Sequence, residues 1–156
     1  MIISSTLQLF LQVRQENPYI ALRSLYVEYY ISPLSRAILT HASQYKSMAI
    51  WGFYSAIYVE TGIIPATRYP NSGFQMFPNP NKQYYVRQYA DDLLKSKTDL
   101  FIYTTAGFLP NMERLFGKPH QSPEDFPEIA SILKKYYKLV VDQPGVKIYI
   151  KQPSGG

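Results

Sequence analysis

The chain has 156 residues, of which 46% are hydrophobic and 17% charged, so its composition predicts one folded domain and excludes a disordered chain. It contains no cysteine, which excludes disulfide bonds, thiolate metal ligands and a cysteine nucleophile. The two histidines, His41 and His120, lie far apart in the sequence and do not indicate a metal site. We therefore expect no metal and no cofactor.

The formal net charge is +5 at pH 7. The basic residues are scattered among acidic ones such as Asp91, Asp92, Asp99 and Asp142, and this scatter disfavours a nucleic-acid partner. The positive excess would suit an anionic membrane surface or a phosphate-bearing ligand equally well. The simplest interpretation is an ordinary solvated surface.

No stretch of the sequence reaches the ~18–20 consecutive apolar residues that span a bilayer. Residues 1–14 are apolar, but they lack the basic start and the small-residue cleavage site of a signal peptide. We interpret them as an amphipathic first helix or as the end of a membrane helix of a longer chain. Residues 1–44 are expected to form a helical segment packed on an α/β domain of residues 45–152, with a frayed tail at 153–156.

The first half of the chain alternates helical and strand patterns. Apolar residues at helical spacing indicate the helices, and short apolar runs beside glycine or proline indicate the strands. Ser32 and Pro33 would supply an N-cap and a first helical position, and Gly62 would end a short helix. The predicted elements are helices over 20–30 and 33–43, a strand over 46–52, a helix over 54–61 and a strand over 63–69.

The second half continues the alternation. Asn81 is expected to cap a helix that carries Arg87 and Asp91 as an i,i+4 ion pair. Ser122 and Asp125 have the spacing of a capping box. The predicted elements are a loop over 70–81, a helix over 81–96, a strand over 99–105, a helix over 122–137 and two strands around a turn at 143–145.

The loop over 70–81 is dense in proline, glycine and asparagine, the residues of turns. It also contains Phe74, Met76 and Phe77, which a polar connector would not need. We expect this loop to pack back on the domain or to contact a partner.

Strands that alternate with helices predict an α/β fold. The expected architecture is a three-layer sandwich with a mixed, mainly parallel sheet, N-terminal helices and a C-terminal β-hairpin. The hairpin would add the antiparallel part of the sheet.

The sequence contains no complete catalytic constellation. A glycine-rich phosphate loop, a Walker lysine motif and a G-x-S-x-G elbow do not occur in it. Asp91 and Asp92 are adjacent, so on a helix they would point about 100° apart and form a poor acid–base pair. A solvated helix face explains them better, and His41 is expected to favour the last carbonyls of its helix. We predict no catalytic residue.

One candidate binding site follows from the expected fold, because ligands of open parallel sheets bind beyond the carboxyl ends of the strands. Together, the residues predicted at those ends would offer stacking surfaces, a positive charge and hydroxyls to a sugar or a phosphate. These candidate residues are Trp51, Tyr54, Arg68, Tyr69, Thr104 and Thr105. In the alternative interpretation, Trp51 and Tyr54 belong to the core and Arg68 pairs with a nearby carboxylate.

Residues 48–69 read MAIWGFYSAIYVETGIIPATRY: a strand, Trp-Gly, an Ile-Tyr helix, a glycine and a Pro-Ala-Thr-Arg-Tyr strand. An aspartate-led strand follows at 99–103, a Leu-x-x-x-Tyr helix end at 133–137 and a final Ile-Tyr-Ile-Lys strand at 148–151. In this order, over roughly residues 33–151, the chain resembles the C-terminal globular domain of bacterial membrane glycosyltransferases that use polyprenyl-phosphate-linked sugars. Protein O-mannosyltransferases and lipid A aminoarabinose transferases are enzymes of this type.

The resemblance implies an extracytoplasmic domain, periplasmic or on the cell surface, packed over a membrane-embedded active site. In such transferases the catalytic acid lies in a loop between early membrane helices, so no catalytic residue is carried over to this sequence. The expected function is that of a non-catalytic soluble accessory domain that shapes or gates the acceptor site. The expected partners are the membrane-embedded part of the same transferase or the membrane surface, with a sugar or lipid phosphate as ligand and no nucleic acid.

Two alternative functions belong to other classes of protein. An autonomous α/β module could bind a small sugar or phosphate ligand in the crevice at the strand ends. A basic nucleic-acid binder rich in tyrosine is disfavoured, because its charges do not cluster and no RNP-type pattern occurs.

Overall fold

The computed structural model describes residues 31–42, 44–96, 98–105 and 121–152. The helix predicted over 20–30, the predictions for residues 1–14, the loop residue His120 and the tail at 153–156 lie outside these residues. The elements are, in chain order, α3 (Pro33–Ala42), β1 (Ser47–Trp51), α4 (Ala56–Thr61), β2 (Ile64–Pro65), α5 (Gly73–Met76), α6 (Lys82–Lys95), β3 (Leu100–Thr104), η1 (Pro123–Asp125), α8 (Pro127–Tyr136), β4 (Tyr137–Gln143) and β5 (Val146–Lys151).

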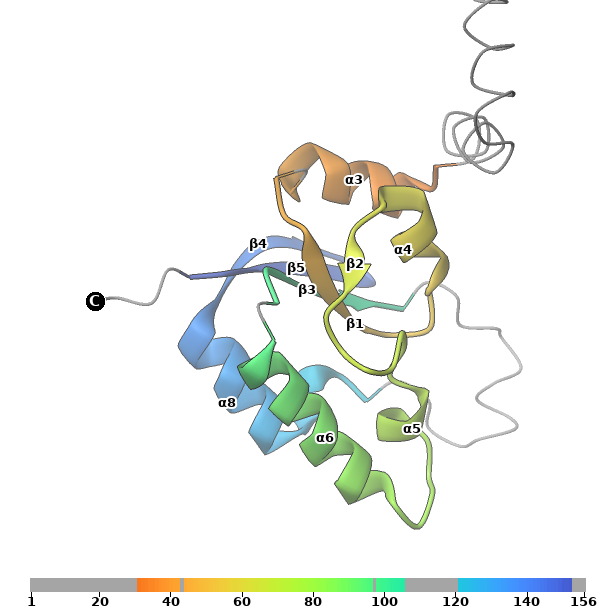
Figure 1. Cartoon of the computed structure of the whole chain (residues 1–156), viewed down its shortest axis with the longest axis vertical. Helices are drawn as coiled ribbons and strands as arrows, with labels where there is room; N and C mark the ends of the chain where they lie inside the picture. Colours follow the sequence, from red (N-terminus) through yellow and green to blue (C-terminus); the bar gives the residue numbers. More distant parts are fainter. Residues whose placement is uncertain (1–30, 43, 97, 106–120, 153–156) are drawn as a thin grey trace, which may run out of the picture.

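The strands form one mixed five-stranded sheet in the order β2-β1-β3-β5-β4. β1 pairs in parallel with β2 and with β3, whereas β5 pairs antiparallel with β3 and with β4. Helices α3 and α4 cover one face of the sheet, and α6 and α8 cover the other (Figure 1). The predicted α/β sandwich with a C-terminal hairpin is confirmed.

The central strands β1 and β3 are buried on both faces, which explains why each reads as a continuous apolar run. Successive side chains of a strand point to opposite faces, so the two strands supply two separate hydrophobic clusters. Met48, Ile50, Leu100 and Ile102 pack toward α3 and α4, whereas Ala49, Trp51 and Phe101 pack toward α6 and α8.

Several predicted helix ends are confirmed in atomic detail. The backbone N–H of Ser35 donates to Ser32 Oγ at 3.1 Å, which makes Ser32 the N-cap of α3. Gly62 ends α4 in the left-handed conformation, at a φ of 70°. Ser122 and Asp125 form the expected capping box, which precedes the short helix η1 and then α8.

Two predictions about α6 are wrong. Asn81 precedes this helix but makes no side-chain capping bond. Asp91 forms its ion pair with Lys95, at 3.0 Å, instead of Arg87. An acid that lies N-terminal to a base at i,i+4 is the favoured orientation on a helix, and Asp91 and Lys95 have that orientation.

The strand predicted over 63–69 is wrong beyond its first residues, because β2 consists only of Ile64 and Pro65. Ala66 N–H still donates to Met48 O at 2.8 Å, so the chain follows β1 for one more residue. The backbone N–H of Arg68 then donates to Asp92 Oδ2 on α6, at 3.0 Å. The side chain of Asp92 on α6 therefore accepts the backbone N–H of Arg68, which the predicted strand would have used for pairing in the sheet.

Beyond the end of β2, residues of other segments form hydrogen bonds with the backbone of β1 in place of a neighbouring strand. Tyr89 of α6 donates its hydroxyl hydrogen to Ile50 O at 2.8 Å. Further along, Gly52 N–H donates to Ser72 Oγ at 2.7 Å, and Ser72 N–H donates to Gly52 O at 3.1 Å. The polar backbone of the strand stays satisfied without a longer β2.

The loop predicted over 70–81 contains the short helix α5. Met76 is buried in the cluster beneath α6, and the rings of Phe77 and Phe53 lie 5.1 Å apart. The expectation that this loop packs back on the domain is confirmed for these residues. Phe74, by contrast, is 51% exposed.

We predict that Gly52→Ala lowers the free energy of unfolding by about 2 kcal/mol or more. Gly52 has a φ of 150°, and a Cβ there would lie 2.2 Å from the backbone oxygen of Thr104 on the neighbouring strand. Urea unfolding, followed by the fluorescence of Trp51, measures the change. The control is Gly73→Ala, whose new Cβ would meet only side-chain atoms of Asn71 and Phe53, at 3.2 Å. An equal effect of both substitutions would contradict the close approach of β1 and β3.

Candidate functional site

The carboxyl ends of β1 and β3 form the topological switch point of the sheet. The two strands are parallel neighbours, but the chain leaves β1 toward β2 on one side, whereas the strands after β3 are added on the other side. Ligand sites of α/β sheets lie at such points, because the diverging connections leave a crevice there. The turn of the β4–β5 hairpin reaches the same end, since Val146 pairs with Thr104.

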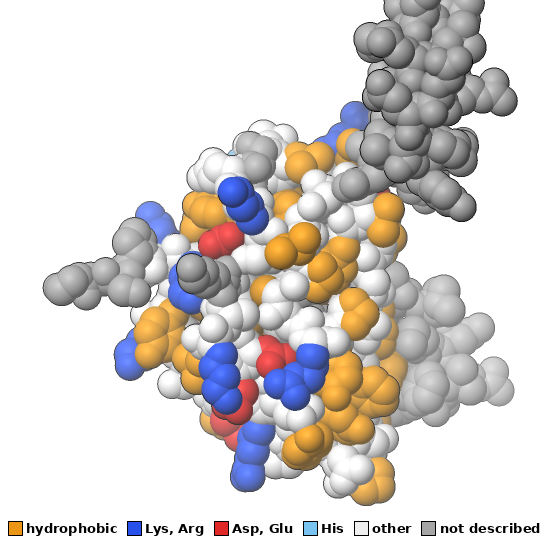
Figure 2. All heavy atoms as spheres, viewed as in Figure 1, with side chains coloured by type: hydrophobic (Ala, Val, Ile, Leu, Met, Phe, Trp, Pro, Cys, Tyr) orange, Lys and Arg blue, Asp and Glu red, His pale blue; other side chains and the backbone are white. Residues whose placement is uncertain are grey.

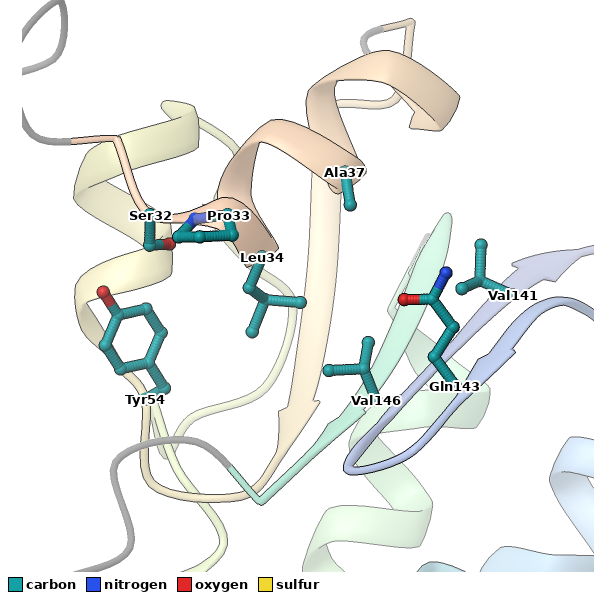
Figure 3. A pocket seen from close by; sticks show the side chains of 8 residues that line it. All are labelled: Ser32, Pro33, Leu34, Ala37, Tyr54, Val141, Gln143 and Val146. Atoms are coloured by element: carbon teal, nitrogen blue, oxygen red, sulfur yellow. The ribbon is translucent and has the colours of Figure 1, made fainter.

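A pocket of about 440 Å³ opens near this end of the sheet, on the face covered by α3 and α4. Figure 3 shows side chains from the start of α3 on one side of the pocket and side chains of the β4–β5 hairpin on the other. Most of the lining is apolar, with hydroxyl groups and one amide among it. The lining residues are Ser32, Pro33, Leu34, Ala37, Tyr54, Val141, Gln143 and Val146.

A buried glutamate holds one wall of this pocket in place. Glu60 of α4 is only 5% exposed, and its carboxylate accepts hydrogen bonds from the hydroxyls of Ser32, Ser35 and Tyr54, at 2.6, 2.6 and 2.8 Å. The backbone N–H of Ser32 donates to the same carboxylate at 3.1 Å. Glu60 therefore ties α4 to the N-terminus of α3, where a negative charge is favourable.

Burial acts to raise the pKa of Glu60, but the hydrogen bonds from Ser32, Ser35 and Tyr54 outweigh it and hold this pKa below its ordinary value. The carboxylate is thus the form that the network stabilises. An ionised carboxylate only accepts hydrogen bonds, so the three hydroxyls are oriented toward Glu60. Ser32 and Tyr54, which also line the pocket, are fixed in position by this arrangement.

Trp51 lies in the core, on the opposite face of the sheet from the pocket. Its side chain has no exposed surface, and its Nε1–H donates to the backbone oxygen of Gln121 at 2.9 Å. Its ring packs against Tyr89 and Phe126, with centroids 5.3 and 5.0 Å away. In this position Trp51 offers no face to a ligand.

Arg68 and Tyr69 lie beside α6, away from the residues of the pocket. The guanidinium of Arg68 forms an ion pair with Asp92, with Nη2 2.7 Å from Oδ1. Burial acts to raise the pKa of Asp92, but the hydrogen bonds and charge of Arg68 lower it below its ordinary value. The hydroxyl of Tyr69 donates to Gln88 Oε1 at 3.3 Å.

Thr104 and Thr105 lie at the end of β3, beside the hairpin turn. Thr104 is 1% exposed, and Thr105 N–H donates to Gly145 O at 2.9 Å. Among the predicted site residues, Tyr54 is the one that lines the pocket of about 440 Å³. The six residues therefore do not converge on one site.

Apart from Tyr54, the residues that line the pocket are not among those predicted from the sequence to bind a ligand, and neither is Glu60. A signal for Glu60 exists in the sequence. It follows Ile57 by three residues, so on a helix both lie on the same face, and Ile57 is buried. An acid on the apolar face of a short helix indicates a buried hydrogen-bond network.

A second carboxylate, Glu124 of η1, has a structural role. Its Oε1 accepts hydrogen bonds from Lys147 Nζ at 2.9 Å and from the hydroxyl of Tyr149 at 2.8 Å. Burial acts to raise the pKa of Glu124, but bonds from Ser122, Lys147 and Tyr149 lower it to about 2. These bonds join η1 to β5.

An aromatic surface lies over α5 and α6, and consists of Tyr69, Phe74, Tyr84 and Tyr85. Phe74 stacks on Tyr85 with centroids 4.9 Å apart, and Tyr69 meets Tyr85 edge-on at 5.8 Å. Phe74 and Tyr84 are 51% and 58% exposed. Figure 2 shows hydrophobic side chains gathered over this part of the molecule, with Lys and Arg side chains beside them.

Comparisons with protein-family models, curated proteins and solved structures returned no match. Within the described ranges, no helix is long and apolar enough to cross a bilayer, and no cluster of three or more acidic or histidine side chains is placed to hold a metal ion.

We predict that Glu60→Gln lowers the free energy of unfolding at pH 7 by about 1–3 kcal/mol, because the amide replaces an acceptor that bonds to several donors. Since the folded-state pKa of Glu60 lies below the ordinary 4.5, the stability that this carboxylate contributes is present above pH 4.5 and is lost as the pH falls through the folded-state pKa. The difference between the two proteins therefore shrinks in acid. Urea unfolding at neutral and acidic pH measures it.

The control is Asp91→Asn, which removes an exposed carboxylate from an i,i+4 pair and is expected to change stability by only ~0.5 kcal/mol. If Glu60→Gln proved as mild as this control, the carboxylate would not be the link between α3 and α4.

Proposed function

We propose that this chain is a non-catalytic accessory domain of a membrane glycosyltransferase that uses lipid-linked sugar donors, and that it shapes or gates the acceptor site. The observation that carries the proposal is the mostly apolar pocket between α3 and the β4–β5 hairpin, at the carboxyl end of the sheet. Its working environment in this proposal is the extracytoplasmic face of a membrane.

The order of elements in residues 48–69 supports the kinship with such transferases. β1 ends at Trp51, Gly52 makes a sharp turn, α4 follows, Gly62 ends it, and β2 begins. The resembling segment of those domains has its elements in the same order, but its Pro-Ala-Thr-Arg-Tyr strand is a strand here only at Pro65. The aspartate that leads the next strand also has a definite role, since Asp99 Oδ2 accepts the backbone N–H groups of Lys46 and Ser47 at 3.1 and 3.2 Å and so joins β1 to β3.

The chemistry of the pocket supports a ligand with an apolar body and a polar end. Leu34 and Val146 offer hydrocarbon surface, and the amide of Gln143 can donate a hydrogen bond to an oxygen of a phosphate or a sugar. The hydroxyls of Ser32 and Tyr54 donate their hydrogens to Glu60, so toward the pocket they offer accepting oxygens. An isoprenoid chain that ends in a phosphate or a phosphosugar has this combination of properties. The net charge of +5 attracts an anionic ligand to the chain as a whole, whereas the described residues that line the pocket include no lysine or arginine.

The second candidate function is an autonomous small-ligand-binding module. It is favoured by the fact that elements of this one chain form the walls of the pocket. The two functions differ in the ligand: the first requires affinity for a lipid phosphate, the second for a soluble metabolite.

Titration of the 156-residue chain with farnesyl phosphate, a short polyprenyl phosphate, tests the proposal. We expect saturable binding, and we expect Ala37→Leu to weaken it about tenfold, equivalent to ~1.4 kcal/mol, because the larger side chain fills the pocket. Isothermal titration calorimetry measures both dissociation constants.

The matched control is Ala130→Leu, which fills a hollow on the opposite face of the sheet, near Leu133 and Tyr149, and should leave binding unchanged. Inorganic phosphate and farnesol each test one end of the ligand and should bind more weakly than farnesyl phosphate. Tight binding of a nucleotide or sugar phosphate, with no binding of farnesyl phosphate, would favour the autonomous module instead.

The aromatic surface over α5 and α6 supports contact with the membrane or with the membrane-embedded part of the transferase. Tyrosine and phenylalanine side chains suit the interface between lipid and water, where one end of the ring is apolar and the other hydrated. The exposed rings of Phe74 and Tyr84 are the outermost part of this surface.

We predict that Phe74→Ser combined with Tyr84→Ser weakens binding of the chain to vesicles of phosphatidylcholine and phosphatidylglycerol by about tenfold, because two apolar rings are lost from the contact. Co-sedimentation with the vesicles measures the partition. The control is Val59→Ser combined with Ile64→Ser, which removes two side chains of similar exposure, 56% and 62%, from outside the aromatic surface. An equal loss in both variants would mean that this aromatic surface is not the membrane contact.

A further inference from the structure

Lysines that are scattered in the sequence come together at one end of the sheet, on the face covered by α6 and α8. Helix α6 ends at Lys95, and Lys134 and Lys135 lie in the last turn of α8. Lys151 ends β5 opposite Tyr137, which belongs to the cluster beneath α6 and α8, so the side chain of Lys151 lies on the same face of the sheet. We call Lys95, Lys134, Lys135 and Lys151 the basic surface.

Backbone hydrogen bonds and a shared hollow hold the elements of the basic surface together. Lys151 N–H donates to Asp99 O, just before β3, and Gln152 N–H donates to Tyr136 O at the end of α8, both at 2.8 Å. A hollow of about 180 Å³ is lined by residues of α6, α8 and β5, namely Leu93, Leu94, Tyr136 and Lys151. The ends of these three elements therefore meet at one place.

Most of the positive charge of the basic surface has no acidic partner among the described residues. Lys95 forms an ion pair with Asp91 at 3.0 Å, whereas the other ion pairs of those residues join Arg68 to Asp92 and Lys147 to Glu124. The dipole of a helix favours lysines in its last turn, which accounts for Lys134 and Lys135 in part. Lys151 ends a strand, so the helix dipole does not account for it.

The basic surface continues the aromatic surface along α6. Tyr84 and Lys95 are 11 residues apart, which is about three helical turns, so they lie on the same side of this helix. Arg87 is exposed between them, and Leu94 is 51% exposed at the same end as Lys95. Figure 2 shows Lys and Arg side chains on the same face of the molecule as the hydrophobic side chains over α5 and α6. A flat partner that lies along α6 would meet aromatic rings at one end and lysines at the other.

A membrane that contains anionic lipids offers the chemistry that complements both surfaces. The strength of binding at a membrane interface grows with the apolar area buried and with the attraction between basic residues and anionic lipids. Single-stranded nucleic acids also combine negative charge with groups that stack on aromatic rings. Phe74 and Tyr85, however, stack on each other with ring centroids 4.9 Å apart, so one face of each ring is already covered. The observations therefore favour the membrane.

We propose that the basic surface and the aromatic surface together form one membrane-binding face that selects membranes with anionic lipids. Helix α6 lies along the membrane in this arrangement, with Phe74 and Tyr84 at the boundary of the acyl chains and the lysines on the phosphates of the lipid head groups. The inference rests on the membrane contact proposed above for the aromatic surface, and it adds the requirement for negatively charged lipid.

Co-sedimentation of the 156-residue chain with vesicles of phosphatidylcholine alone, and with vesicles that also contain phosphatidylglycerol, tests this selectivity. The anionic lipid should strengthen binding about tenfold or more, and an increase of salt from about 0.05 to 0.5 M should remove most of this gain, because salt screens exposed charges. Lys134→Gln combined with Lys135→Gln should weaken binding to the anionic vesicles about tenfold and leave binding to the neutral ones unchanged.

The matched control is Arg36→Gln combined with Lys138→Gln, which removes the same amount of charge from the opposite face of the sheet. Arg36 is exposed on α3, and Lys138 lies opposite Ile150, which packs against the cluster beneath α3 and α4. This variant should change binding to the anionic vesicles by less than about threefold. Urea unfolding of each variant establishes that the fold persists.

Equal binding to neutral and anionic vesicles would overturn this inference and leave the membrane contact of the aromatic surface in place. Absence of binding to either kind of vesicle would overturn that contact as well. An equal loss in the control variant would show that binding follows the net charge of the chain, which contradicts a defined basic surface. Tighter binding to a single-stranded oligonucleotide than to the anionic vesicles would also overturn the proposal, because the partner would then be a nucleic acid.

Discussion

The parallel pairing of β1 and β3, buried on both faces, is the constraint on which the other elements depend. Each strand sends alternate side chains into two clusters, so α3 and α4 must pack on one face and α6 and α8 on the other. The pairing is tight at its carboxyl end, where Gly52 approaches the backbone of Thr104. Asp99 joins the same two strands at their amino end, since it binds the backbone of Lys46 and Ser47. The crevice at the switch point exists because these strands are held together while their connections diverge.

Glu60 turns that crevice into a shaped pocket. A carboxylate is costly to bury, and this one is stabilised by hydroxyl and backbone donors that come from α3 and from the segment after β1. The same hydrogen bonds determine where Ser32 and Tyr54 stand at the pocket wall. The network thus contributes to stability and to the geometry of the candidate site, whereas Trp51, on the other face, contributes to the core alone. A site that is held by a polar network and lined by hydrocarbon suits binding and positioning of a ligand.

The pocket and the aromatic surface lie on different parts of the domain. The pocket lies on the side of α3 and α4, and the aromatic surface lies over α5 and α6. In the function that we propose, the pocket would hold a lipid phosphate while the aromatic surface rests on the membrane or on the membrane part of a transferase.

The amino-acid sequence by itself determined the class of fold and most of its elements, because the periodic spacing of apolar residues, the helix caps and the turn residues are local signals. The runs of β1 and β3, the cap at Ser32 and the glycine at 62 are all of this kind. Only the tertiary structure decided the site. Residues that are distant in the chain decide whether Arg68 faces a ligand or Asp92, whether Trp51 is exposed, and where β2 ends. Glu60 likewise acquires its role from Ser32, which lies 28 residues earlier. Hydrogen bonds between distant segments leave no periodic pattern in a sequence, so the partners of these side chains become defined only when the layers pack together.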